Sequence, residues 1–280
     1  MSRSFGAIVL AIALAGPAAA HGDLHEQIAA VSAKIARSPN DPDLYLKRAE
    51  LNRFHEDWTA SEADYRRAER LAPTLFLVSL GRGKLYLARG KYAPALAELD
   101  KVIAVEPDHV DARVTRARIF ALLARGQDAA ADFSHAIALA DAPEPDWYLE
   151  RAQALASLAG YNINSALSGL DEGLAKLGPL PVLELYAVEL EQVRGQVDAA
   201  LVRLEIMRVQ ASRQETWWER IGDVQARAGR SAEAHASYAN AQQSLLAVPE
   251  HLRNVPSMQA LAARLRDKLT SPSEPPASVH

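Results

Sequence analysis

Three histidines near the amino terminus are the residues whose type and spacing best suit a metal ion. His21 and His25 are four residues apart, and His55 follows later in the chain. If the chain is cleaved after Ala20, His21 carries both a free α-amine and an imidazole, and such nitrogen ligands suit Cu(II). Copper binding through these histidines is therefore one hypothesis. The alternative is that His25 is an ordinary helix-start residue and His21 an ordinary chain end.

The rest of the sequence offers little catalytic chemistry. The 280 residues contain no cysteine, which excludes a thiolate metal site, a cysteine nucleophile and a disulfide scaffold. The zinc-protease, phosphate-loop, dinucleotide-binding and serine-hydrolase motifs are also absent. The net charge of −4 gives no reason to expect nucleic-acid binding. We therefore expect a protein that is not an enzyme and needs no cofactor, with copper as the single exception considered.

The first 20 residues have the pattern of an export signal. Arg3 precedes an apolar run from Phe5 to Ala15, and Pro17 and three alanines follow, the small-residue pattern that signal peptidase accepts. The run is shorter than the ~20 apolar residues that a spanning helix needs. The sequence predicts cleavage after Ala20 and a periplasmic or secreted protein without a membrane span. An uncleaved membrane anchor is the alternative.

The elements that must position any site are helices in a repeating pattern. Alanine, the best helix former, occurs 54 times. A period of 34 residues runs through the chain, and it is carried by prolines, by small residues and by bulky residues. The residues that keep this step are Pro39, Pro73 and Pro107, then Ala49, Gly83 and Ala117, then Tyr65, Leu99 and Phe133.

This pattern resembles the tetratricopeptide repeat family, whose repeat is a pair of antiparallel helices with a small residue in the first helix. The sixth repeat carries the resemblance most closely, at Trp218, Gly222, Gly229, Ala234, Tyr238 and Ala241. In the first repeat Glu56 stands where a turn glycine is usual. The resemblance implies an all-α, right-handed superhelical solenoid of about six helix-turn-helix repeats, with capping helices at both ends.

The domain organisation follows from the repeats and their flanks. Asp23 and Glu26 resemble a capping box that starts a helix. Pro256 starts a second flanking helix. With one helix at each end, the sequence predicts that both ends of the array are capped. The predicted divisions are a signal peptide (1–20), an amino-terminal capping helix (21–41), six repeats (42–246), a carboxy-terminal capping helix (247–269) and a disordered tail (270–280).

In the resembled family, ligands lie along the concave surface that the first helices line. The equivalent positions are basic in repeats one to three and acidic later, which would fix the direction of an extended peptide. The alternative is a solvated face without such a role. The predicted binding residues are Lys47, Glu50, Arg53, Lys84, Thr115, Arg118, Glu150, Gln153, Glu189 and Asp223.

The combined prediction is a non-catalytic scaffold or adaptor in the periplasm that binds a peptide or protein of unknown identity. Copper handling through His21 and His25 is the alternative. Trp217 lies beside the core position Trp218 and must point elsewhere. We expect it to pack against the preceding helix, with an interface anchor as the other interpretation.

Overall fold

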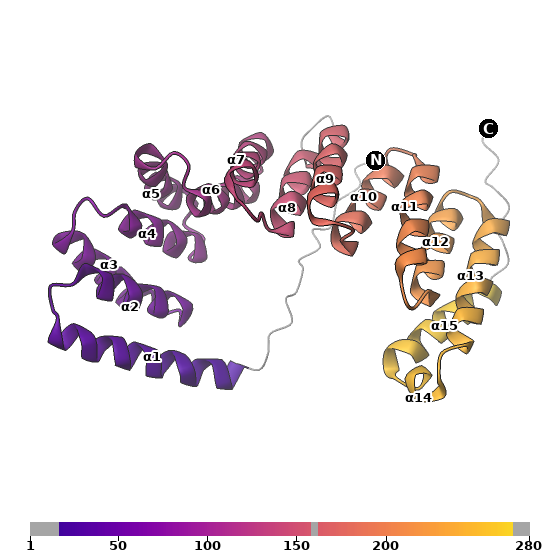
Figure 1. Cartoon of the computed structure of the whole chain (residues 1–280), viewed down its shortest axis with the longest axis horizontal. Coiled ribbons are helices and arrows are strands. Elements are labelled where there is room, and N and C mark those ends of the chain that lie inside the picture. Colours follow the sequence, from indigo (N-terminus) through magenta and orange to yellow (C-terminus); the bar gives the residue numbers. More distant parts are fainter. Residues whose placement is uncertain (1–16, 158–161, 271–280) are drawn as a thin grey trace. The chain divides into compact units, whose positions relative to one another are not determined.

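The computed structural model describes residues 17–157 and 162–270. Within these ranges the chain forms helices and no strand (Figure 1), which confirms the all-α prediction. The helices are α1 (Pro17–Arg37), α2 (Pro42–Phe54), α3 (Trp58–Leu71), α4 (Phe76–Ala88), α5 (Tyr92–Val105), α6 (Val110–Leu122), α7 (Gly126–Leu139), α8 (Pro145–Ala156), α9 (Ile163–Leu177), α10 (Pro181–Val193), α11 (Val197–Gln210), α12 (Glu215–Arg227), α13 (Ser231–Leu246), α14 (Glu250–Arg253) and α15 (Pro256–Thr270).

Helices α2 to α13 follow one another as six pairs, and these pairs correspond to the six predicted repeats. Contacts between residues divide the chain into two compact units, residues 1–119 and residues 120–280, and each unit is described by itself. Most of the predicted signal sequence and most of the predicted tail lie outside the described residues. None of the described helices combines the length and apolar character that a membrane crossing requires.

The core of the first unit consists of local clusters between neighbouring helices. One cluster joins α1 to α4 and includes Val31, Tyr65 and Leu85, of which the last two are fully buried. The next joins α4 to α6 around Leu99 and Ile119. Because one helix pair cannot bury its apolar side alone, each pair depends on the next for its core.

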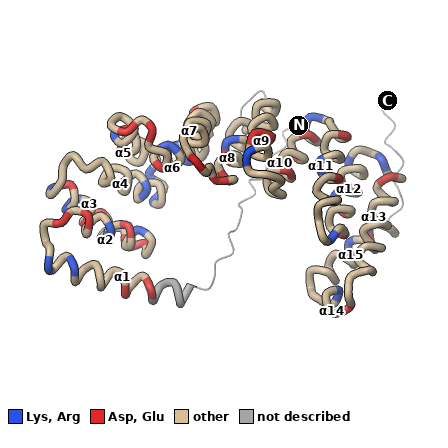
Figure 2. The backbone as a smooth tube through the Cα atoms, viewed as in Figure 1, with Lys and Arg blue, Asp and Glu red and all other residues tan. Residues whose placement is uncertain are grey.

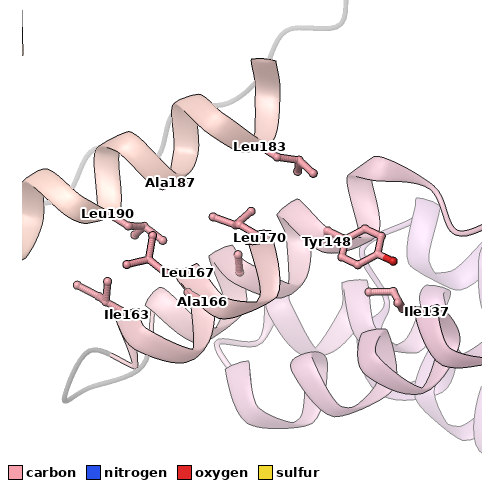
Figure 3. Packing of buried hydrophobic residues seen from close by; sticks show 10 residues of the cluster. Ile137, Tyr148, Ile163, Ala166, Leu167, Leu170, Leu183, Ala187 and Leu190 are labelled. Carbon is pink, nitrogen blue, oxygen red and sulfur yellow. The ribbon is translucent and has the colours of Figure 1, made fainter. Parts of the chain in front are cut away.

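The second unit repeats this arrangement. Figure 3 shows the cluster in which Tyr148 of α8, Leu170 of α9 and Leu183 of α10 are fully buried. A second cluster joins α10 to α12, and Trp217 packs against this cluster, which includes Ala200 and Leu204 of the preceding helix α11. Trp218 contacts this cluster as well as the last one, which joins α12, α13 and α15.

Small residues permit the close approach of the two helices in a pair. A β-carbon added at Gly222 would lie 2.5 Å from Cε1 of Tyr238, and one at Gly83 would lie 2.8 Å from the Leu99 side chain. Ala49 occupies the same register position and is fully buried. Steric space therefore explains the small residue at this position in five of the six pairs.

The amino-terminal helix departs from the prediction at its start. Helix α1 begins at Pro17, so Asp23 and Glu26 lie inside it and do not form a capping box. The run Ala18–Ala20 has high helix propensity and extends the helix toward the amino terminus. The carboxy-terminal half of α1 packs as expected, because Val31 and Ile35 are buried in the first core cluster.

Candidate functional site

The predicted binding residues of the first helix pair form a small polar group on α2. Lys47 is exposed. Glu50 is half-buried and accepts a hydrogen bond of 2.8 Å from Nη2 of Arg53 and another from the hydroxyl of Tyr65. Burial, together with the charge of Glu50 and this hydrogen bond, raises the pKa of Tyr65 well above its usual range. Because Glu50 and Arg53 form an ion pair, their charges offset each other.

The predicted residues of the next two pairs are also engaged within the first unit. Lys84 on α4 forms an ion pair with Asp111 on α6. Thr115 is buried and donates a hydrogen bond of 2.7 Å to the carbonyl oxygen of Asp111, so it is a packing residue of α6 and not a surface residue. Arg118 is half-buried. Figure 2 shows both basic and acidic positions along α2 and α3.

In the second unit the row continues on α8 and α10. Gln153 and Glu189 are exposed, and Glu150 is half-buried. Tyr186 stands three residues before Glu189 and is half-buried. Burial and the neighbouring carboxylate of Glu189 raise the pKa of Tyr186 to about 12, so its hydroxyl remains protonated at neutral pH.

The last residue of the row is partly neutralised by the carboxy-terminal capping helix. Asp223 on α12 accepts a hydrogen bond of 2.6 Å from Nζ of Lys268 on α15 and one of 2.9 Å from the hydroxyl of Tyr238. Sequence reasoning missed Lys268 because it lies 45 residues further along the chain. The predicted contrast between basic and acidic halves is therefore weaker than the sequence suggests. Six of the ten predicted residues belong to the first unit and four to the second.

The structure brings two of the three predicted histidines, His25 and His55, into contact. Nε2 of His25 on α1 lies 3.1 Å from Nε2 of His55, the residue that follows α2. Their rings pack edge to face with centroids 4.3 Å apart. His21 belongs to α1, but its side chain lies outside the described residues. Among the described side chains no group of three or more His, Cys, Asp or Glu residues could hold a metal ion.

A series of arginines on the first helices was missed altogether. Arg48, Arg82 and Arg116 keep the 34-residue step. Arg48 binds Asp64 through two hydrogen bonds of 2.7 and 2.8 Å, and Arg116 binds Asp100 at 2.7 Å. The signal was available, because an acidic residue follows each of these arginines 16 positions later: Asp64, Glu98 and Asp132.

The comparisons with known proteins agree with this architecture. No protein-family model matches the chain, and no curated protein matches it in sequence. A tetratricopeptide repeat protein from Parabacteroides merdae superposes with a TM-score of 0.53 at 14% identity, over 89% of this chain and 94% of the other. The C-terminal part of a tetratricopeptide repeat-containing protein from Cytophaga hutchinsonii gives a TM-score of 0.54 at 14% identity, over 88% and 89%. The chain therefore has the tetratricopeptide-repeat fold.

Proposed function

We propose that this chain is an exported, non-catalytic scaffold that binds a peptide or a protein on the first helices of its repeats. One observation carries the proposal. In all six pairs a buried residue, small in five of them, is followed by a polar residue that is not buried. Packing dictates the first position of each step and leaves the second at least partly exposed at the surface. These six polar residues are Glu50, Lys84, Arg118, Gln153, Glu189 and Asp223.

Export rests on the first 20 residues, whose basic start, apolar run and terminal alanines suit a cleaved signal. Repeat arrays of this kind present extended surfaces built from many short segments. Such a surface suits an extended ligand better than it suits a reaction, which needs groups gathered at one point. A periplasmic or secreted adaptor is therefore the function that these features support best.

A charge reversal tests the binding surface. We expect Lys47→Glu with Lys84→Glu to abolish capture of the partner, because both cations lie on first helices and Lys47 is exposed. The measurement is crosslinking in cells followed by mass spectrometry of the proteins recovered with each variant. The matched control is Arg66→Glu with Lys101→Glu, which makes the same change of charge on the second helices α3 and α5.

The double variant must keep its helical circular dichroism, because Lys84 also pairs with Asp111. Loss of the same proteins in both double variants would show a general effect of charge. Unchanged capture by the Lys47 and Lys84 variant would contradict the proposed surface.

Copper binding is a second proposal, favoured by the contact between His25 and His55. A metal ion ~2 Å from each imidazole nitrogen is compatible with their 3.1 Å separation. His21 and His25 are four residues apart in the sequence of α1, a spacing that places two positions on the same face of a helix. We expect bound copper in the protein isolated from cells, with large losses in His25→Ala and His55→Ala and in a variant with one residue inserted before His21.

Elemental analysis of the purified proteins measures the copper content, and His235→Ala on α13 is the control. Amino-terminal sequencing of the same material checks that the chain starts at His21. Equal copper in all the variants would exclude the three histidines as ligands.

A further inference from the structure

A polar cavity of about 410 Å³, broadly open to solvent, lies in the second unit between α7, α8 and α9. Hydroxyl, amide and charged side chains provide most of its lining, with Leu155 as the apolar member. The polar residues of the lining are Ser134, Arg151, Asn164, Ser165, Ser168 and Glu172. The cavity thus combines several hydrogen-bond donors with one cation and one anion.

Arg151 is the buried charge of this cavity, and 8% of its side chain is exposed. Its Nη2 donates to the carbonyl oxygen of Gly169 at 3.1 Å and to the carboxylate of Glu172 at 2.6 Å. Its Nη1 lies 3.4 Å from the hydroxyl oxygen of Ser134. The side chain of Glu172 is 52% exposed, so the only carboxylate in the lining lies at its solvent edge.

The repeat register shows what is unusual about this arginine. Arg151 continues the series Arg48, Arg82 and Arg116. Arg48 faces Asp64, which is buried in the second helix of the same pair. The fourth pair has Gly169 at the position of Asp64, directly before the bulky core residue of α9.

The second acidic position is missing as well. Arg116 is paired with Asp100 on the preceding helix, and the residue 34 positions after Asp100 is Ser134. Arg151 therefore has neither the carboxylate that pairs with Arg48 nor the one that pairs with Arg116. The acidic partner of Arg151 is instead Glu172, on the next turn of α9.

Glycine at position 169 also lets the Arg151 side chain lie close to α9. A β-carbon there would lie 2.9 Å from Nη2 of Arg151. The missing side chain therefore removes a negative charge and leaves space that the guanidinium occupies. The first turn of α9, where Asn164 and Ser165 line the cavity, contains no acidic residue that would offset the positive end of the helix dipole there.

We propose that this cavity binds a tetrahedral oxyanion of the phosphate class, either free or as a phosphate ester. Arginine binds phosphate oxygens through two parallel N–H donors. The serine hydroxyls and the amide of Asn164 offer further donors around the same space, which suits four acceptor oxygens better than the two of a carboxylate. The anion takes the place of the Glu172 carboxylate on Arg151, and Glu172 turns outward into solvent.

Calorimetric titration of the whole chain with inorganic phosphate tests this proposal. We expect one saturable site, and at least tenfold weaker binding in Gly169→Asp, which restores the carboxylate found in the first three repeats. Glu172→Gln removes the competing carboxylate and is expected to tighten binding several-fold. Arg116→Gln, which removes the counterpart of Arg151 in the third pair, is expected to leave phosphate affinity unchanged.

The remaining titrations define the ligand and the limits of the proposal. Sulfate should bind and acetate should not, while tighter binding of glycerol 3-phosphate than of phosphate would identify an ester as the ligand. Glu172 is exposed, so Glu172→Gln folds even if Gly169→Asp does not. Absence of saturable phosphate binding in Glu172→Gln, equal binding of acetate, or equal losses in Gly169→Asp and Arg116→Gln would each overturn the proposal.

Discussion

Single residues at the turns show how strictly the repeat controls the backbone. The turn inside a helix pair places one residue in the left-handed region, and Gly90, Gly195 and Gly229 occupy it at φ values of 66°, 72° and 75°. Glu56 and Ala124 take the same position at φ values of 61° and 55°. A residue with a β-carbon in this conformation costs ~1–2 kcal/mol. The fold therefore imposes the turn even where the sequence lacks the favoured residue.

Replacing the two non-glycine turn residues with glycine should stabilise the protein. We expect Glu56→Gly and Ala124→Gly each to raise the free energy of unfolding by about 0.5–1 kcal/mol, because the relief of strain exceeds the added chain entropy. Urea denaturation measures the change. As a control, Ala97→Gly in the interior of α5 should lower the free energy of unfolding by about 1 kcal/mol. Lower stability of both turn variants would refute the assignment of strain.

At the scale of elements, the carboxy-terminal cap is held by charge as well as by apolar packing. Leu261 and Leu265 of α15 are almost fully buried against α13. Glu219 of α12 is also buried, and it accepts two hydrogen bonds of 2.9 Å from Arg264 and one of 2.9 Å from Lys268. Burial acts to raise the pKa of Glu219, but the hydrogen bonds from these two cations outweigh it and lower the pKa.

This lowered pKa predicts acid sensitivity of the carboxy-terminal end. The contribution of Glu219 is fully present above its unfolded pKa of about 4.3 and is lost as the pH falls through its lower folded value. We expect Glu219→Gln to be less stable than wild type at pH 7, by about 1–3 kcal/mol, and to lose less stability between pH 5 and pH 3. Denaturation followed by tryptophan fluorescence reports on this region through Trp217 and Trp218.

The control for this experiment is Glu233→Gln, an exposed carboxylate on the neighbouring helix α13. Its stability should follow wild type at every pH. Parallel acid profiles for wild type and Glu219→Gln would mean that Lys268 and Arg264 do not hold the cap through Glu219.

At the scale of the whole molecule, the protein is a series of local cores. Each buried cluster joins helices that are near one another in sequence, such as α1 to α4 in the first unit and α7 to α10 in the second. Stability in such an array is approximately a sum of repeat and interface terms. A ligand on the proposed surface would contact residues about 34 positions apart, so that surface would depend on stacking between pairs and not on any single pair.

The sequence by itself determined the helix pairs, their number and the residues that pack between them. Gly83 and Gly222 are examples, because a 34-residue step of small residues has one simple explanation in helices that approach closely. These features were predictable because helix propensity, turns and the packing of adjacent helices act over short stretches of chain. The row of six polar residues that are not buried was also predictable, since each of them directly follows the packing residue of its pair.

The tertiary structure decided which charges and donors meet. Lys84 pairs with Asp111, 27 residues away, and Lys268 reaches Asp223 across 45 residues. The cavity around Arg151 likewise exists because α7 and α9 place hydroxyl groups around an arginine of α8 whose carboxylate partner differs from that of its counterparts. Such contacts depend on the directions of individual side chains after the helices have stacked. The repeat pattern gives the position of each residue along a helix, but the partner across the interface is set only when the pairs come together.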